Sequence, residues 1–223
     1  MGKVVLRYVW ELPVRITHWV NVLAIITLCV TGLFIGAPLT LALEPSQYIM
    51  GWFRFAHFTA GYAFAVSVAA RAVWSLMGNE YCRWRVFFPW FTAEGRRRML
   101  EVFRWYVFLS RTPPKDLGLN AMAATVYFLV FLLYLLLIAT GFALYVQYIP
   151  GTVAHSAAGW LTHLVPLQWL RLVHHLAMWM LIGFIINHIY SGWLVDISVK
   201  GGVMSGIFSG FKPEETEGGG EVT

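Results

Sequence analysis

The chain has 223 residues, of which 59% are hydrophobic, 12% are charged and 11 are tryptophan. Together with a mean hydropathy of +0.65, this composition excludes an ordinary soluble globular protein and indicates an integral membrane protein. The formal net charge is +5, but the basic residues gather at the ends of apolar segments. Membrane topology therefore explains the charge, and we expect no nucleic-acid partner.

Four apolar segments follow one another along the chain, each near or above the roughly 20 residues that a membrane-spanning helix requires. They lie at about 17–36, 56–77, 121–149 and 172–195. The sequence therefore predicts an all-α integral membrane protein, a four-helix transmembrane bundle over residues 1–211, with a disordered acidic tail over 212–223. No small-residue cleavage site follows a short apolar run, so we expect no removable signal peptide.

The basic residues predict the topology. Of the 16 lysines and arginines, all but Arg54 and Arg171 lie before the first segment, near the end of the second (Arg71), between the second and third, or after the fourth. The positive-inside rule then puts both termini and the middle loop in the cytoplasm of a multi-pass protein of the inner, cytoplasmic membrane. Within that loop, residues 95–110 mix arginines with apolar side chains and predict an amphipathic helix in the lipid interface.

The loop on the opposite side, at about 150–170, contains Trp160 and Trp169. These tryptophans suit either a docking surface for a partner protein or an ordinary aromatic belt at the bilayer surface. The sequence does not separate the two interpretations.

Histidines occur at two depths of the predicted bundle. His174 and His188 are fourteen residues apart on the last segment, which brings a helix back to within about 40° of the same face, roughly 21 Å further along. His57 matches the outer depth of His174, and His18 the inner depth of His188. Ionisable side chains inside a membrane are functional-site candidates, and two stacked histidine pairs suit two haem irons.

His175 is the alternative to His174. It lies thirteen residues before His188, which turns it roughly 140° away from that face, so we prefer His174. The chain has two cysteines and no C-x-x-C-H motif, which excludes covalent haem attachment and leaves non-covalent haem b.

Three of the candidate ligands are preceded, three residues earlier, by an arginine. Residues three apart are neighbours on a helix, and a guanidinium there could bind a haem propionate or simply anchor the helix at the interface. The pairs are Arg15 with His18, Arg54 with His57, and Arg171 with His174. Arg71, fourteen residues after His57, is a lesser propionate candidate.

A Thr-Gly pair occurs in both the first and the third segment, at Gly32 and Gly141. Glycine removes side-chain bulk where a porphyrin edge must pass, although it serves close helix packing equally well. Gly32 lies fourteen residues after His18 and so on the predicted haem-facing side. Both glycines are therefore candidate cofactor-binding residues.

Four stretches, 13–19, 54–58, 140–145 and 174–190, resemble the cytochrome b subunit of membrane-bound uptake NiFe hydrogenases and, more distantly, the membrane subunit of formate dehydrogenases. The resemblance covers nearly the whole chain. It implies that His18, His57, His174 and His188 bind two haem b groups. It also implies hydrogenase partners: a small subunit whose iron–sulfur clusters reduce the outer haem and, through it, the large subunit.

The same resemblance implies membrane quinone as the electron acceptor and a place in a hydrogen:quinone oxidoreductase, with no hydrogen-activating site in this chain. Three alternatives remain open from the residues alone. They are the cytochrome b subunit of a formate dehydrogenase-like or other respiratory oxidoreductase, a transporter, and a membrane anchor without haem.

Overall fold

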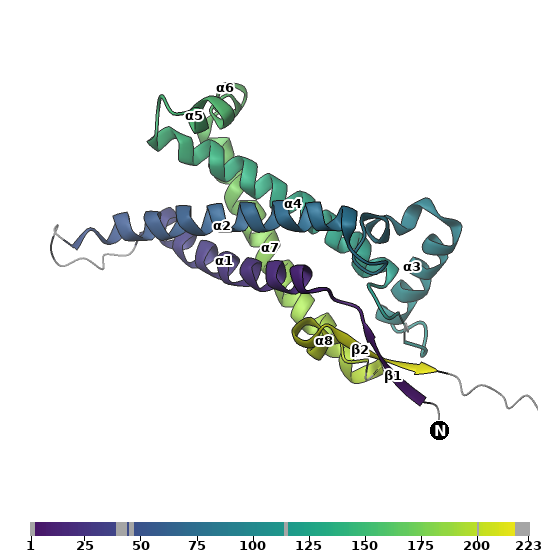
Figure 1. Cartoon of the computed structure of the whole chain (residues 1–223). Helices are drawn as coiled ribbons and strands as arrows, with labels where there is room; N and C mark the ends of the chain where they lie inside the picture. The colour runs from purple at the N-terminus through teal and green to yellow at the C-terminus, as the bar shows by residue number, and fades with distance from the viewer. Residues whose placement is uncertain (1–2, 39–43, 45–46, 114–115, 200, 217–223) are drawn as a thin grey trace, which may run out of the picture. The chain divides into compact units, whose positions relative to one another are not determined.

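The computed structural model describes residues 3–38, 44, 47–113, 116–199 and 201–216. Four of its helices are long and apolar enough to cross a membrane (Figure 1). They are α1 (Leu12–Gly36), α2 (Ile49–Met77), α4 (Ala121–Tyr145) and α7 (Leu167–Val199). The predicted class, an all-α membrane protein with four spanning helices, is confirmed. Helices α1, α2 and α7 begin five to seven residues earlier than predicted. Each added stretch contains one arginine (Arg15, Arg54 or Arg171), which interrupts the apolar run but does not end the helix.

Shorter elements connect and flank the spanning helices. They are β1 (Lys3–Tyr8), the 3₁₀ turns η2 (Trp84–Phe87), η3 (Pro89–Phe91) and η4 (Val146–Tyr148), helices α3 (Ala93–Tyr106), α5 (Val153–Ala158), α6 (Leu161–Leu164) and α8 (Val203–Ser209), and β2 (Phe211–Thr216).

The chain divides into two compact units where the sequence analysis predicts one domain. Unit 1 comprises Met1–Ile16, Arg71–Val130 and Phe184–Thr223, and unit 2 comprises Thr17–Ala70 and Phe131–Gly183. Each spanning helix therefore contributes one stretch to each unit.

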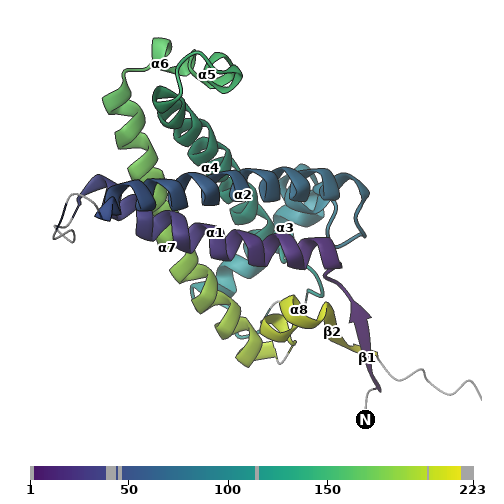
Figure 2. The same cartoon turned by 60° about the vertical axis from the view of Figure 1, so that its left-hand side comes forward.

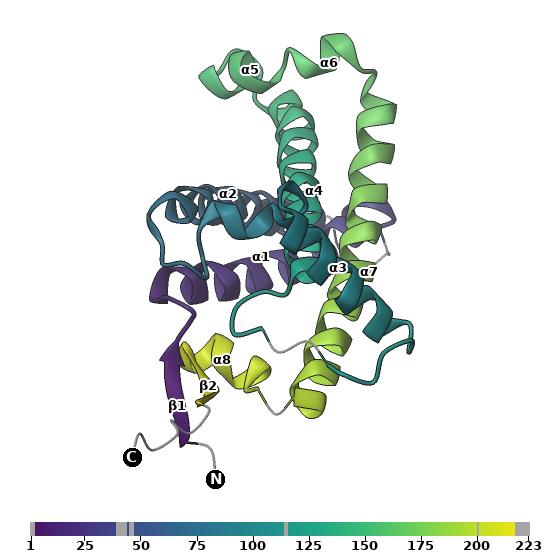
Figure 3. The same ribbon diagram turned by 90° about the vertical axis from the view of Figure 1, so that its right-hand side faces the viewer.

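In unit 2, helices α1 and α2 run side by side (Figure 2). The rings of Phe34 and Phe53 stack with centroids 3.9 Å apart, and the Ser67 hydroxyl donates to the carbonyl of Thr17 at 3.2 Å. The stretches of α4 and α7 that belong to unit 2 are joined through α5 and α6 (Figure 3).

In unit 1, the two ends of the chain form an antiparallel pair, with β1 and β2 in register from Lys3↔Thr216 to Tyr8↔Phe211. Residues 212–216, which the sequence analysis places in a disordered tail, are thus part of a strand, and 217–223 lie outside the described residues. The chain turns into β2 at Gly210, whose φ of +89° favours glycine. Strand β2 takes its hydrogen bonds from the other end of the chain, which local composition does not reveal.

Glu11 ties the N-terminal segment to the end of α2. Its carboxylate accepts hydrogen bonds from Trp74 Nε1 and from the backbone N–H of Asn79, both at 2.9 Å. The Asn79 side chain in turn donates to the carbonyl of Val9 at 3.1 Å, and Val9 is fully buried. One carboxylate therefore holds two segments of unit 1 together.

Helix α3 (Ala93–Tyr106) overlaps the predicted 95–110 region, beginning two residues earlier and ending four residues earlier, and is amphipathic. Its N-terminus is capped by Thr92, whose hydroxyl accepts from the backbone N–H of Gly95 at 3.0 Å, the usual role of a threonine before a helix. Val102 is buried, whereas Leu100 and Phe103 are about half exposed. This apolar exposed face suits the predicted interfacial position.

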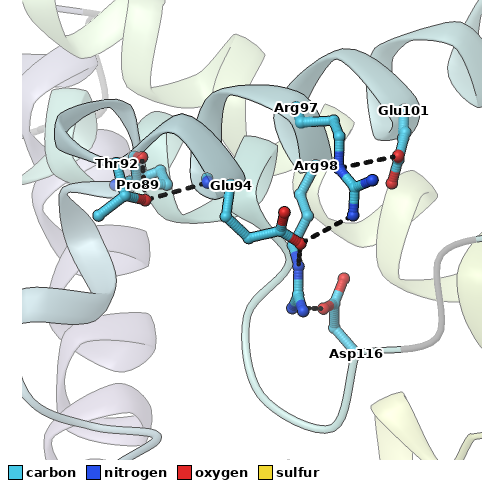
Figure 4. Close-up of polar contacts among 8 residues, drawn as sticks. Pro89, Thr92, Glu94, Arg97, Arg98, Glu101 and Asp116 are labelled. Atoms are coloured by element: carbon cyan, nitrogen blue, oxygen red, sulfur yellow. Dashed lines mark hydrogen bonds and ion pairs between the residues drawn. The ribbon is translucent and has the colours of Figure 1, made fainter.

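The charged face of α3 is a chain of ion pairs (Figure 4). Glu94 accepts from Arg98 at 2.9 Å and from Arg97 at 3.1 Å, and these hydrogen bonds lower the pKa of the Glu94 carboxyl. Arg98 also lies 3.6 Å from Asp116, a carboxyl whose pKa is raised by burial. The pairs reduce the positive charge of the arginine run on this face.

We expect Glu11→Ala to lower the free energy of unfolding by about 1–3 kcal/mol, because it leaves the Trp74 indole and the Asn79 amide without their acceptor. Thermal unfolding of the detergent-solubilised protein measures the change. The control is Glu101→Ala, which removes an exposed ion pair with Arg97 at 3.7 Å, worth less than about 1 kcal/mol. Equal melting temperatures for the two variants would contradict the prediction.

Candidate functional site

Unit 2 contains a cavity of about 500 Å³ lined by all four spanning helices. This volume is within the roughly 300–1,000 Å³ of pockets that hold cofactors and other small molecules. Most of the lining is aliphatic or aromatic. Among the polar residues that line it are Arg54, His57, Arg171, His174 and His175.

His57 lies against the Thr-Gly pair of α1. Its Nδ1 is 2.8 Å from the Thr31 hydroxyl. A Cβ placed on Gly32 would be 3.2 Å from His57 Cε1, so glycine allows the ring to approach the helix. The Nδ1–Cε1 edge of the ring faces α1, and Nε2 is the nitrogen left for a ligand.

His174 repeats this arrangement on the other two helices. Its Nδ1 is 2.9 Å from the Thr140 hydroxyl of α4, and a Cβ on Gly141 would be 3.1 Å from His174 Cε1. In both places one helix supplies Thr-Gly and the next spanning helix supplies the histidine. The neighbours of Gly32 and Gly141 are thus histidine rings, where the sequence analysis expects a porphyrin edge.

Two of the predicted arginines line the same cavity. The Arg54 guanidinium lies over the Tyr148 ring, 5.3 Å from its centroid. Arg54 Nε is buried and has no hydrogen-bond partner within the described part of the chain. Arg171 is exposed near the start of α7. An unsatisfied buried donor beside two histidines would suit an anionic group of a bound cofactor.

His175 also reaches the cavity, so the alternative to His174 stays open. Its Nδ1 donates to the carbonyl of Arg171 at 2.8 Å, and its Nε2 lies near Gly36, at 2.7 Å from a Cβ placed there. Among the described residues, His175 has no threonine partner of the kind that His57 and His174 share.

The other predicted arginines, Arg15 and Arg71, lie in unit 1 and contact backbone carbonyls. Arg15 Nη1 donates to Phe208 at 2.5 Å, and Arg71 Nη2 donates to Cys82 at 3.3 Å. Neither lines the cavity of unit 2.

The second predicted histidine pair is divided between the units. His188 is in unit 1, with Nδ1 3.0 Å from the Tyr127 hydroxyl and its ring stacked on Phe184 at 5.5 Å between centroids. His18 is in unit 2 and meets Trp19 edge-on at 5.1 Å. Their pairing stays a prediction.

Sequence reasoning missed the hydroxyls that contact the histidines, those of Thr31, Thr140 and Tyr127. The repeated Thr-Gly pair could have indicated Thr31 and Thr140, but only its glycines were interpreted as candidate site residues. No signal in the sequence indicated Tyr127.

The cavity fits a b-type haem. Imidazoles from two different helices can serve as axial ligands, the lining is mostly apolar, and the buried Arg54 guanidinium has a donor to spare for a propionate. Of the Arg54 guanidinium, the buried atom is Nε. Together, the histidines, the apolar lining and this donor are typical of membrane cytochromes. A model of the family described as prokaryotic cytochrome b561 matches residues 9–210, and the chain belongs to this family. It is therefore a membrane electron-transfer protein of the b-haem type.

Known proteins similar to this chain match along most of their length. A "Probable Ni/Fe-hydrogenase B-type cytochrome subunit" of Bradyrhizobium diazoefficiens is 41% identical over 91% of this chain and 84% of its own. The protein of that name in Cupriavidus necator is 38% identical, and the match covers 92% of this chain and 86% of the relative. A "Probable Ni/Fe-hydrogenase 1 B-type cytochrome subunit" of Escherichia coli is 34% identical over 94% and 92%. These matches confirm the resemblance drawn from the motifs.

We expect Gly141→Ala to reduce the haem bound per chain, because the new methyl group would press on the His174 ring at 3.1 Å and displace its Nε2. The haem content and Soret spectrum of the purified protein measure the effect. Gly183→Ala is the control, since a Cβ there meets nothing within 4 Å. Full haem content in Gly141→Ala would show that the ring position does not matter.

Proposed function

We propose that this chain is the di-haem cytochrome b subunit of a Ni/Fe hydrogenase and passes electrons from hydrogen oxidation to membrane quinone. The observation that carries the proposal is the cavity of unit 2, where His57 and His174 have matching surroundings beside Arg54 and Arg171. The names of the similar proteins support a hydrogenase as the partner.

The outer haem would be bound by His57 and His174 through Nε2. Bound haem supplies a one-electron ferric–ferrous couple. Arg54 and Arg171 would hold the propionates, which are anionic and must be paired when the macrocycle is buried. The apolar lining excludes water from the site, and Gly32 and Gly141 keep the two histidine rings close to their helices.

The inner haem would be bound by His18 and His188. Tyr127 and Phe184 hold the His188 ring by a hydrogen bond and by stacking. Arg71 keeps Nη1 buried without a hydrogen-bond partner among the described residues, which would suit an inner propionate, and Arg15 is the second candidate for that role.

The orientation follows from the basic residues: both termini face the cytoplasm, and α5 and α6 face outward from the inner membrane. Near these short helices Val153, Trp160 and Leu164 are 87%, 55% and 70% exposed. This apolar surface would receive the hydrogenase small subunit, whose iron–sulfur clusters would reduce the outer haem. Quinone would take two electrons and two protons near the inner haem.

We expect about two haem b per chain in the purified complex, measured by the pyridine haemochromogen assay. His174→Ala and His188→Ala should each remove one haem, because each deletes an axial ligand of a different group. His175→Ala should keep both. A complex in which His175→Ala loses a haem and His174→Ala does not would reverse the choice between these neighbours.

We further expect His188→Ala to slow quinone reduction by hydrogen while the outer haem is still reduced. The measurement compares haem reduction and quinol formation in membranes supplied with hydrogen. Reduction of a dye that takes electrons directly from the hydrogenase is the control and should be unchanged. Quinone reduction at the unmodified rate would contradict a route through the inner haem, and haem reduction by formate instead of hydrogen would point to a different partner.

A further inference from the structure

The hydroxyl protons of Thr31 and Thr140 are already committed within their own helices. Thr31 donates to the carbonyl of Thr27 at 2.6 Å, and Thr140 donates to the carbonyl of Leu136 at 2.7 Å. A carbonyl oxygen can only accept, and a hydroxyl has one proton to give. Each threonine oxygen must therefore accept a hydrogen bond from the Nδ1–H of the neighbouring histidine.

This fixes the tautomer of both histidines. His57 and His174 carry their proton on Nδ1 and present an unprotonated Nε2, the form that binds a metal.

The glycine that follows each threonine fixes the orientation of the ring. At Gly32 a Cβ would be 3.2 Å from Cε1 and 3.7 Å from Nδ1 of His57; at Gly141 the corresponding distances to His174 are 3.1 and 3.8 Å. The same ring edge faces the helix in both places, so rotation of the ring would break its hydrogen bond. Two facing pairs of helices thus orient two imidazoles in the same way in one cavity.

We propose that Thr31 and Thr140 are positioning residues for the outer haem. By accepting from Nδ1–H, they select the ligating tautomer and hold the ring plane. They also increase the electron-donating strength of Nε2, which favours ferric over ferrous iron and lowers the midpoint potential of this haem. The proposal rests on the proposed function, in which His57 and His174 are the axial ligands.

The test uses Thr31→Val and Thr140→Val in the intact complex, since valine keeps the branched shape and removes the hydroxyl. We expect haem to remain bound, the outer-haem midpoint potential to become more positive in each variant, and the shift to be larger in the double variant. The electron paramagnetic resonance spectrum of the ferric haem should change as well, because the ring planes are released. Thr31→Ser and Thr140→Ser should restore both signals.

Thr27→Val is the matched control. Thr27 makes the same kind of bond within α1, to the carbonyl of Leu23 at 2.9 Å, one turn before Thr31, and the described structure gives its hydroxyl no histidine contact. An equal potential shift in Thr27→Val and Thr31→Val would overturn the proposal, because the effect would then belong to helix packing. Haem loss in Thr31→Val that Thr31→Ser reverses supports it, and haem loss that serine does not reverse overturns it.

Different results would contradict the proposed function and the positioning role of the threonines. If His57→Ala and His174→Ala retain the outer haem, the ligands lie elsewhere. If both lose it while the valine variants keep an unchanged potential and an unchanged resonance spectrum, only the positioning role is overturned.

Discussion

A histidine inside an apolar helix pair needs a partner for each of its ring nitrogens, and this requirement organises unit 2. The first nitrogen of His57 and of His174 is met by a threonine whose own proton is committed to its helix. The second, Nε2, is left for the group that fills the cavity. Unpaired polar atoms are costly in a membrane. A bound group that pairs with Nε2 of both histidines and with Nε of Arg54 would therefore explain why the cavity, its glycines and this arginine occur together.

The site is built twice from one arrangement. Helices α1 and α4 each supply a Thr-Gly pair, while α2 and α7 each supply an arginine followed three residues later by a histidine. A single ligand site on one helix would leave the opposite side of the iron to any available group. In the proposed site, two matching sets of residues would instead give the iron two imidazoles in the same protonation state and with the same hydrogen bond, so that neither ligand would dominate its electronic properties.

The spanning helices, and the meeting of His57 with His174 in one cavity, could be predicted because hydropathy and residue spacing are local properties of the chain. The pairing of His18 with His188 stays a prediction. The proposed tautomer of His57 could not be predicted from the sequence. It depends on a hydroxyl 26 residues away in sequence, whose position follows from helix packing. For the same reason the contact of Gly32 with the His57 ring could not be predicted, and its place beside a porphyrin edge stays a prediction. The strand over 211–216 was missed because its partner lies at the other end of the chain.

The same contacts couple haem binding to stability. Without a ligand, the cavity contains the buried Arg54 Nε, which has no partner within the described residues, and two imidazoles that each offer an unused lone pair. Haem would satisfy these groups together: the iron would bind the lone pairs, and an anionic propionate would accept a hydrogen bond from the guanidinium, which keeps its proton. A ligand that binds only the folded state stabilises that state, so the haem in this cavity would act as a structural element of unit 2 as well as an electron carrier.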